Sequence, residues 1–500
     1  KIINTVSILL LLQTAYYAQQ PVNRTSTPKI ADVLAQQPAE DRAKYLAAMR
    51  ELEGFSTEDF TILLQGLGPQ GSNNAPREFA TNSYAFFVMQ PGKEQLREVY
   101  VNGLLSALDK VKDANNRAYI LETLKFCAKN ESIAKVATYL SDDFLTEKAA
   151  RVLSAIHTEE AAKALNVALA ADVNEKVATA VVTALGALKS KDAEARIIVL
   201  LNKYASSNNF VFTGLTALSK IGGTQSYDVF YQHAKAADLG FDRTNAAGLA
   251  IDYANSLLKN NQQELANKLA TAIYNEASAD KGIGAKIAAL ELLNRINPAA
   301  QKKNLLKLVS DNNPILRNVA LSLLSSDATT TADIKKIASS ITKLSPEAQE
   351  SVLNFLIVND AKATIPVVQK SLKKNKDSGA KIATYKTLSA LSGGANTSFI
   401  IDEIANANEE ELKALKNLLL KYLVYDRIKQ GIIGHLLDAD YITELPIVMG
   451  GFYKTIKMHR PYFKNEDKNS VFFTAYVYAF AKLAFIENDL VRLRETCEDL

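Results

Sequence analysis

The sequence predicts an all-α protein in which antiparallel helix pairs stack into a right-handed α-solenoid. Three observations lead to this prediction: a repeat of about 32 residues, apolar side chains at helical spacing within each repeat, and a composition suited to many helices joined by short polar turns. The chain of 500 residues has no Trp, 12 Pro and 21 Gly. This length exceeds what one compact hydrophobic core usually serves, so several domains or a repeat array is expected.

The repeat is marked by a leucine near the end of the first helix of each unit. The clearest unit covers residues 173–201, where two apolar helical segments flank the polar turn at 189–192. Successive marker leucines lie 29, 32, 33, 39, 36, 31, 32, 32 and 32 residues apart. They are Leu124, Leu153, Leu185, Leu218, Leu257, Leu293, Leu324, Leu356, Leu388 and Leu420.

Each predicted helix carries one apolar stripe. In the clearest unit Val177, Ala180, Val181 and Ala184 follow the spacing i, i+3, i+4 and i+7. A single helix pair cannot bury both of its apolar faces, whereas stacked neighbours can. The repeat therefore predicts a continuous stack rather than separate globular domains.

The chain divides into five predicted segments. Residues 1–18 are expected to be a signal peptide, because Lys1 precedes an apolar run at 6–12 that is too short to span a bilayer, and Ala18 suits a cleavage site. A buried N-terminal helix is the alternative. The other segments are a linker and leading helix at 19–37, a helical cap at 38–114, the repeats at 115–423 and a tail at 424–500.

The tail differs from the repeats in composition. Residues 424–500 are rich in aromatic side chains, and residues 471–485 are strongly apolar. This stretch suits either a helix or a strand, and recurring Ala favours a helix. The tail is expected to be a capping element or a small separate module.

Short motifs within the chain resemble those of HEAT repeats. They are ALG at 184–186 and IPVV at 365–368. A narrower set is similar to the N-terminal part of exported bacterial HEAT proteins that carry a C-terminal jelly-roll domain of the 3-keto-disaccharide hydrolase type. This set consists of IADVLA at 30–35, PA at 38–39, GSNNA at 71–75, PGKEQLR at 91–97 and GLLSALDK at 103–110.

The resemblance implies an exported protein, a HEAT-type stack and a carbohydrate-processing setting. In that family the chemistry is attributed to the jelly-roll domain, and no series of short alternating strands is evident after residue 423. No catalytic residue is therefore carried over. The expected function is a periplasmic or secreted scaffold for protein or ligand binding. The alternatives are the N-terminal module of a larger 3-keto-glycoside or disaccharide hydrolase, and a hydrolase with its site between the repeats and the tail.

No motif indicates a catalytic, cofactor or metal site. The sequence contains no nucleophile elbow, phosphate loop or dinucleotide fingerprint. His157 precedes two glutamates and His435 precedes Asp438, but a zinc site needs more ligands than either pattern supplies, so both are interpreted as solvated segments. The sequence does not decide whether the chain is an enzyme. Cys127 lies on an apolar helix face and is expected to be a buried thiol, and its pairing with Cys497 stays open.

The charge pattern bears on partners. The net charge of +4 gives no case for nucleic-acid binding, and no segment reaches transmembrane length. The expected partner is a protein or an attached domain, with an acidic or carbohydrate ligand as a further possibility. Basic residues recur on the second helices of successive repeats, where they form either a stripe that attracts an acidic partner or a solvated face. They are Lys135, Lys163, Arg196, Lys268, Lys303, Lys336 and Lys370.

Overall fold

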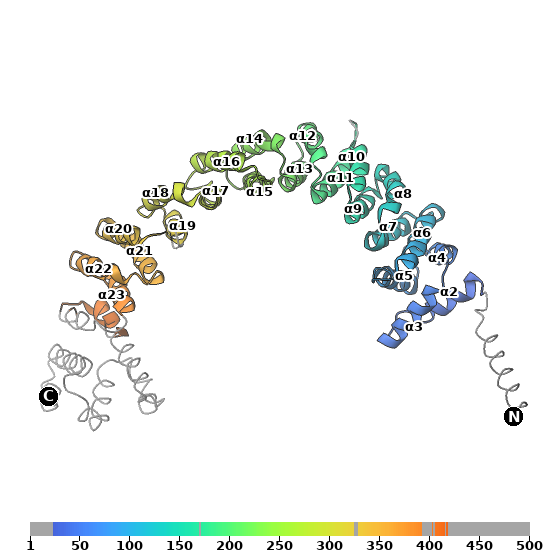
Figure 1. The fold of residues 1–500 in the computed structure, drawn as a ribbon, viewed down its shortest axis with the longest axis horizontal. Coiled ribbons are helices and arrows are strands. Elements are labelled where there is room, and N and C mark those ends of the chain that lie inside the picture. The colour runs from blue at the N-terminus through green and yellow to red at the C-terminus, as the bar shows by residue number, and fades with distance from the viewer. Residues whose placement is uncertain are drawn as a thin grey trace, which may run out of the picture. The chain divides into compact units, whose positions relative to one another are not determined.

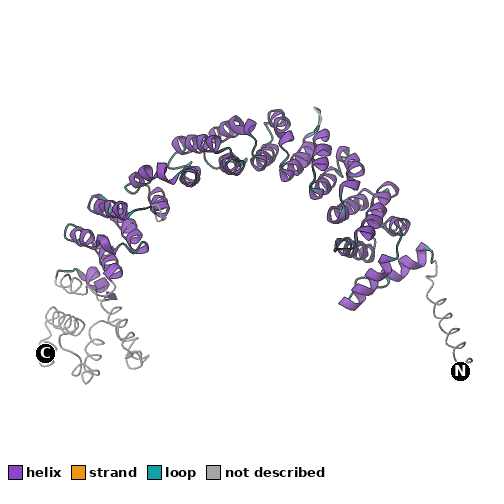
Figure 2. Ribbon diagram, in the orientation of Figure 1, coloured by secondary structure: helices purple, strands orange, loops and turns teal. Residues whose placement is uncertain are grey.

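The computed structural model describes residues 24–169, 172–324 and 329–392, together with 403, 406–415, 417 and 418. Every regular element in these ranges is a helix, as Figures 1 and 2 show. The chain forms two compact units, Lys1–Ala289 and Leu290–Leu500, which are described separately. The predicted all-α stack is confirmed for the described residues. The predicted signal peptide and the tail at 424–500 lie outside them.

The first unit begins with five helices before the regular pairs. The first of them lies within the segment 19–37, which was predicted to hold a linker and a leading helix. Pro28 sits in its first turn, where a missing N–H has no helical partner to lose. Ser56 caps the third helix and shares a capping box with Asp59. The helices are α2 (Ser26–Leu34), α3 (Arg42–Glu53), α4 (Thr57–Gln65), α5 (Ala75–Phe87) and α6 (Glu94–Lys110).

Five helix pairs follow in the first unit. The first helices of successive pairs pack against one another in a row, and Figure 1 shows them on the inside of the bend of this unit, with the second helices outside. The first helices are α7 (Ala114–Cys127), α9 (Thr146–Ile156), α11 (Glu175–Leu188), α13 (Asn208–Ile221) and α15 (Ala246–Lys259). The second helices are α8 (Ile133–Ala137), α10 (Glu159–Ala168), α12 (Glu194–Lys203), α14 (Tyr227–Ala236) and α16 (Gln263–Glu276).

The second unit continues the pattern of alternating first and second helices. Helix α17 (Ile283–Ile296) begins before the boundary and ends after it. Pro314 occupies the first position of α19, where its missing N–H costs no helical hydrogen bond. The remaining helices are α18 (Pro298–Leu308), α19 (Pro314–Leu324), α20 (Thr331–Ser340), α21 (Pro346–Val358), α22 (Ile365–Leu372) and α23 (Ser378–Ser392).

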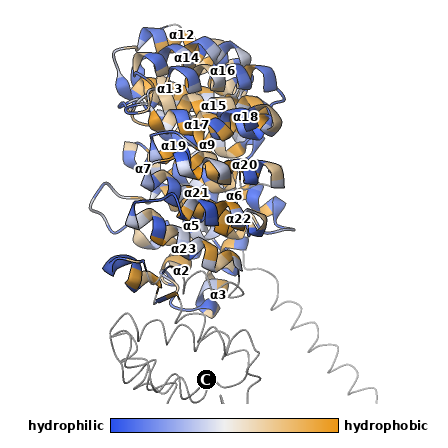
Figure 3. Cartoon of the chain, turned by 90° about the vertical axis from the view of Figure 1, so that its left-hand side faces the viewer, coloured by the Kyte–Doolittle hydropathy of each residue, from blue (hydrophilic) through white to orange (hydrophobic). Residues whose placement is uncertain are grey.

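The marker leucines form the core of the stack. Nine of the ten fall within the described residues, each lies in a first helix, and none has more than 3% of its surface exposed. Leu420 lies outside the described residues. Figure 3 shows the polar turns at the edges of the helices and the apolar residues along the helices themselves. The period read from the sequence is therefore the period of buried contacts between neighbouring first helices.

The longest step, between Leu218 and Leu257, has a local cause. Helices α12 and α14 have the same length, but nine residues separate α14 from α15, whereas four separate α12 from α13. Asp242 holds this longer loop by accepting hydrogen bonds from the backbone N–H groups of Thr244 and Ala246, both at 3.0 Å. The extra residues are thus accommodated in a turn without lengthening the helices.

Many second helices begin with a short 3₁₀ turn. Such turns precede α8, α12, α14 and α22, at Asn130–Ser132, Lys191–Ala193, Thr224–Ser226 and Lys362–Thr364. The last residue of each is small and buried. These turns let the chain reverse within a few residues while the second helix stays packed on the first.

Candidate binding groove

A groove crosses three successive first helices of the first unit, α9, α11 and α13. Its volume is about 670 Å³. Seven of its twelve lining residues are Thr, Ser or Ala, and four carry charged side chains. The lining residues are Thr146, Glu147, Arg151, Ser154, Glu175, Lys176, Thr179, Ala180, Thr183, Ala184, Ala187 and Asn209.

The repeat explains why these side chains face one surface. Thr183 lies two residues before the marker leucine of α11, and Ala187 lies two residues after it. Equivalent positions on neighbouring first helices point the same way, since the helices repeat the same contacts. We call this surface of α7, α9, α11 and α13 the first-helix face. The groove occurs where its positions are filled by Thr and Ala.

The threonines of the groove keep part of their hydrogen-bonding capacity. The hydroxyl of Thr179 donates to the carbonyl of Glu175 at 2.8 Å, and that of Thr183 donates to the carbonyl of Thr179 at 2.7 Å. A hydroxyl that donates once still has lone pairs with which to accept. Both side chains therefore present acceptors along the groove floor.

A cluster of charges adjoins the groove on the α7 side. The carboxylate of Glu122 lies 2.6 Å from the Lys148 ammonium, 3.2 Å from that of Lys125 and 3.6 Å from the Arg151 guanidinium. Arg151 also contacts Glu147 at 2.8 Å. Burial raises the pKa of Glu122, but hydrogen bonds from Lys148 and Lys125 outweigh it and hold the pKa below its usual value. By formal charge, the three cations and two carboxylates of this cluster sum to one net positive charge.

An exposed aromatic pair lies on the far side of this cluster. Phe86, from α5, and Phe126, from α7, have ring centroids 4.8 Å apart. They keep 57% and 39% of their surface exposed, and the ammonium of Lys125 lies 4.6 Å from the Phe126 ring centroid. Phe126 is one helical turn beyond Glu122, so Phe126 and the charge cluster lie next to the groove on the first-helix face, and Phe86 contacts Phe126 from α5.

The arrangement suits binding by surface contact. In the described part of the chain, no group of three or more His, Cys, Asp or Glu side chains is placed to hold a metal ion. No helix among the described residues is long and apolar enough to cross a membrane. What the first-helix face offers is hydrogen-bond acceptors, cations and an apolar platform.

The predicted basic residues all lie on second helices, away from this face. Lys135 pairs with Asp109, and Lys163 lies 2.7 Å from Glu159. Arg196 donates to the carbonyl of Leu169 at 2.8 Å, and the Lys268 ammonium lies 4.6 Å from the Tyr227 ring centroid. Lys303, Lys336 and Lys370 are exposed on α18, α20 and α22 of the second unit. The stripe stays a prediction.

Among the four histidines and two cysteines of the chain, the structure describes His157, His233 and Cys127. His157 is exposed in a left-handed conformation at the end of α9. His233 is half-buried on α14, and burial lowers the pKa of its imidazole. Cys127 is fully buried, as predicted, and burial raises the pKa of its thiol to about 12. His435, His459 and Cys497 lie outside the described residues.

The repeat register of the sequence contains a signal for the charge cluster. Glu122, Arg151 and Thr183 each lie two residues before a marker leucine, in three successive repeats. Aligning the first helices on that leucine places all three on one face. The contact between Glu122 and Arg151 confirms that this register brings neighbouring side chains together.

Comparisons with known proteins gave structural matches only. No protein-family model and no curated protein sequence matches the chain. Among solved structures it is similar to Kap121p, with 11% identity and a TM-score of 0.43 over 93% of this chain and 57% of that one. For Kap121p bound to Pho4p, the identity is 11% and the TM-score 0.44, over 95% of this chain and 66% of that one. For Kap121p bound to RanGTP, the identity is 11% and the TM-score 0.45, over 94% of this chain and 58% of that one. The chain spans less than two thirds of each.

Proposed function

We propose that the chain is a binding scaffold that holds an extended polypeptide segment in the groove over α9, α11 and α13. The observation that carries this proposal is the groove itself, which is lined by residues of three successive first helices and has short Thr and Ala side chains along α11. The hydroxyls of Thr179 and Thr183 supply acceptors for the backbone N–H groups of an extended chain, and Arg151 and Lys176 supply donors at the edges. Repeat stacks commonly present such elongated binding surfaces.

A peptide selection tests the proposal. The full chain is immobilised and panned against random peptides of about 12 residues, which span about 40 Å when extended. Thr183→Phe fills the groove with an aromatic ring, whereas Val167→Phe places the same ring on the exposed surface of α10. We expect Thr183→Phe to weaken the selected peptides at least tenfold and Val167→Phe to leave them unchanged. Equal binding to both variants would contradict the proposal.

We also propose that the chain is exported. This proposal rests on Lys1 and the short apolar run at residues 6–12. Expression of the full reading frame in a Gram-negative bacterium, followed by N-terminal sequencing of the protein in the periplasmic fraction, is expected to yield a chain that begins at Gln19. Retention of the uncleaved chain in the cytoplasm would count against export.

The carbohydrate-processing setting rests on the sequence resemblance alone. Under the alternative proposal, this chain is the N-terminal module of a larger 3-keto-glycoside or disaccharide hydrolase. Sequencing the gene beyond codon 500 and assaying the purified 500-residue chain on a 3-keto-glycoside separate the two. A downstream hydrolase domain would favour the module, and hydrolysis by this chain alone would refute the scaffold proposal.

A further inference from the structure

We infer that the polypeptide segment held on the first-helix face carries an acidic side chain with a large apolar side chain three to four residues away. This inference rests on the proposed function and specifies its partner. The acidic side chain meets Arg151 and Lys148, and the apolar side chain packs on Phe86 and Phe126. From Arg151, which also lines the groove, the segment continues over α11.

The charge cluster selects an acidic group. Three cations surround the carboxylate of Glu122, and Glu147 supplies the only second carboxylate among these contacts. The Arg151 side chain is the most accessible of the three cations, with 53% of its surface exposed, against 31% for Lys125 and for Lys148. A guanidinium has five N–H donors, so Arg151 has donors left for a partner carboxylate. A basic residue placed there would be repelled by the same cations.

The aromatic pair selects an apolar group beside it. Phe86 and Phe126 come from different helices, contact each other and remain exposed to solvent. Phe79 is also exposed and lies on α5 seven residues before Phe86, about two helical turns away on the same side of the helix. It therefore extends the apolar surface on α5. An aromatic or large aliphatic side chain of the partner that packs on this surface would shield the phenylalanine rings from water. Burial of apolar side chains in this way usually provides the dominant contacts of protein interfaces.

Repeat geometry fixes the spacing between the two partner side chains. Phe126 lies four residues, about 6 Å of helix rise, beyond Glu122 on α7. Arg151 occupies the position of Glu122 on α9, and neighbouring helices pack about 9 Å apart. The diagonal from Phe126 to Arg151 is then about 11 Å, which three to four residues of extended chain cover.

The peptides selected on the full chain test this inference by their sequences. We expect them to share an Asp or Glu three to four residues from Phe, Tyr, Trp or Leu. Arg151→Glu and Phe126→Ala are each expected to weaken a synthetic peptide with this pattern at least tenfold, while Arg151→Lys is expected to weaken it less. Raising the salt concentration is expected to weaken binding to the parent chain and to have less effect on Arg151→Glu. Circular dichroism checks that each variant is folded.

The outcomes separate the two proposals. If Thr183→Phe abolishes binding but the peptides lack the acidic and apolar pair, the inference is overturned and the polypeptide scaffold stands. The same holds if Arg151→Glu and Phe126→Ala both bind as the parent does. If Thr183→Phe binds as well as Val167→Phe, the scaffold proposal fails and the inference fails with it.

Discussion

Glu194, the first residue of α12, accepts two hydrogen bonds from Ser226 of the next repeat. Its Oε1 lies 2.9 Å from the Ser226 backbone nitrogen and 2.7 Å from the Ser226 Oγ. Both residues are buried. A built Cβ on Gly223 would lie 1.9 Å from the second carboxylate oxygen, so a side chain at this point would displace the Glu194 carboxylate. One repeat thereby fixes the turn from which the next second helix starts.

Removing this carboxylate is expected to destabilise the first unit. Glu194→Ala leaves the N–H and O–H of Ser226 buried without a partner, a change that costs roughly 1–3 kcal/mol. Glu194→Gln keeps an acceptor and is expected to cost less. Urea unfolding followed by circular dichroism gives the midpoints. Glu159→Ala, which removes an exposed ion pair, serves as the control and is expected to change little. Equal midpoints for Glu194→Ala and Glu159→Ala would contradict the prediction.

Gly186 permits the close approach of α11 and α13. A built Cβ on Gly186 would lie 2.6 Å from the Ala217 Cα, a backbone atom that cannot move without shifting α13. We expect Gly186→Ala to lower the free energy of unfolding by roughly 1–3 kcal/mol. Gly284 in α17 is the matched control, because a Cβ there meets nothing within 4 Å. Gly284→Ala is expected to raise stability by roughly 0.5–1 kcal/mol. Thermal melting of the two variants compares them, and a stable Gly186→Ala would refute the close contact.

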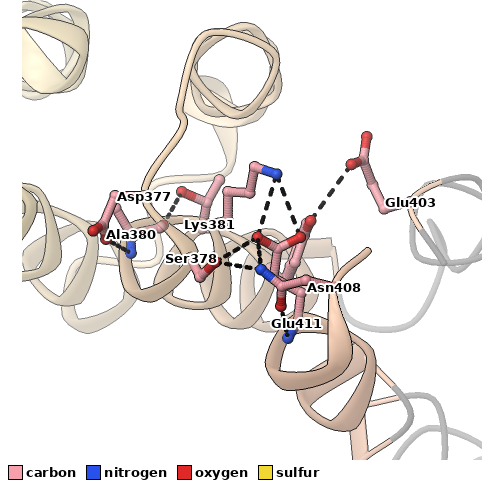
Figure 4. Close-up of polar contacts among 9 residues, drawn as sticks. Asp377, Ser378, Ala380, Lys381, Glu403, Asn408 and Glu411 are labelled. Atoms are coloured by element: carbon pink, nitrogen blue, oxygen red, sulfur yellow. Dashed lines mark hydrogen bonds and ion pairs between the residues drawn. The ribbon is translucent and has the colours of Figure 1, made fainter. Parts of the chain in front are cut away.

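A buried carboxylate links α23 to the segment that follows it in the second unit. Glu411 has 2% of its side chain exposed, accepts from Ser378 at 2.8 Å and lies 3.3 Å from the Lys381 ammonium, as Figure 4 shows. Lys381→Met removes its only cation in this network and is expected to cost roughly 3–5 kcal/mol. Adding Glu411→Gln to Lys381→Met should restore part of the loss, since no unpaired charge remains buried. Urea midpoints are compared for Lys381→Met, Glu411→Gln and the double variant. If the stability losses of the two single variants add up in the double variant, the two side chains are not paired.

The pH dependence of stability should include a contribution from Asp333. Hydrogen bonds from Lys302 and Thr330 lower the pKa of this carboxyl from 3.8 to about 2. Because the folded pKa is depressed, the stabilisation is fully present above about pH 4 and is lost as the pH falls toward 2. Melting temperatures at pH 6 and pH 2.5 should therefore differ less for Asp333→Asn than for the parent chain. An unchanged difference would show that Asp333 does not titrate in this window.

The basic residues of the second unit can be tested as a stripe. If Lys303, Lys336 and Lys370 attract an acidic polymer, Lys303→Glu is expected to weaken retention on immobilised polyglutamate, and high salt should abolish retention of the parent chain. Thr183→Phe should have no effect on retention, because the groove lies in the first unit. Retention that responds neither to salt nor to Lys303→Glu would leave these lysines as solvated surface.

The sequence predicted the fold well because burial repeats with the period of the chain. Each described marker leucine is buried, and local signals such as the Ser56 cap and Pro314 act within one helical turn. The groove was harder to predict. It depends on the size of the side chains at Thr183 and Ala187 compared with the side chains that face them from both neighbouring helices. The aromatic pair joins residues 40 positions apart, and no local pattern in the sequence marks Phe86 and Phe126 as partners.

We expect the hydrogen bonds between Glu194 and Ser226 to limit how freely this chain can gain or lose repeat units during evolution. The residues that open α8, α14 and α22 are Ile133, Tyr227 and Ile365, and none of them carries a carboxylate. A duplication or deletion that placed a different turn after α12 would leave the buried carboxylate of Glu194 without the hydrogen bonds from Ser226. The repeats on either side of this junction are therefore expected to be inherited together, as one block, even where the rest of the array changes in length.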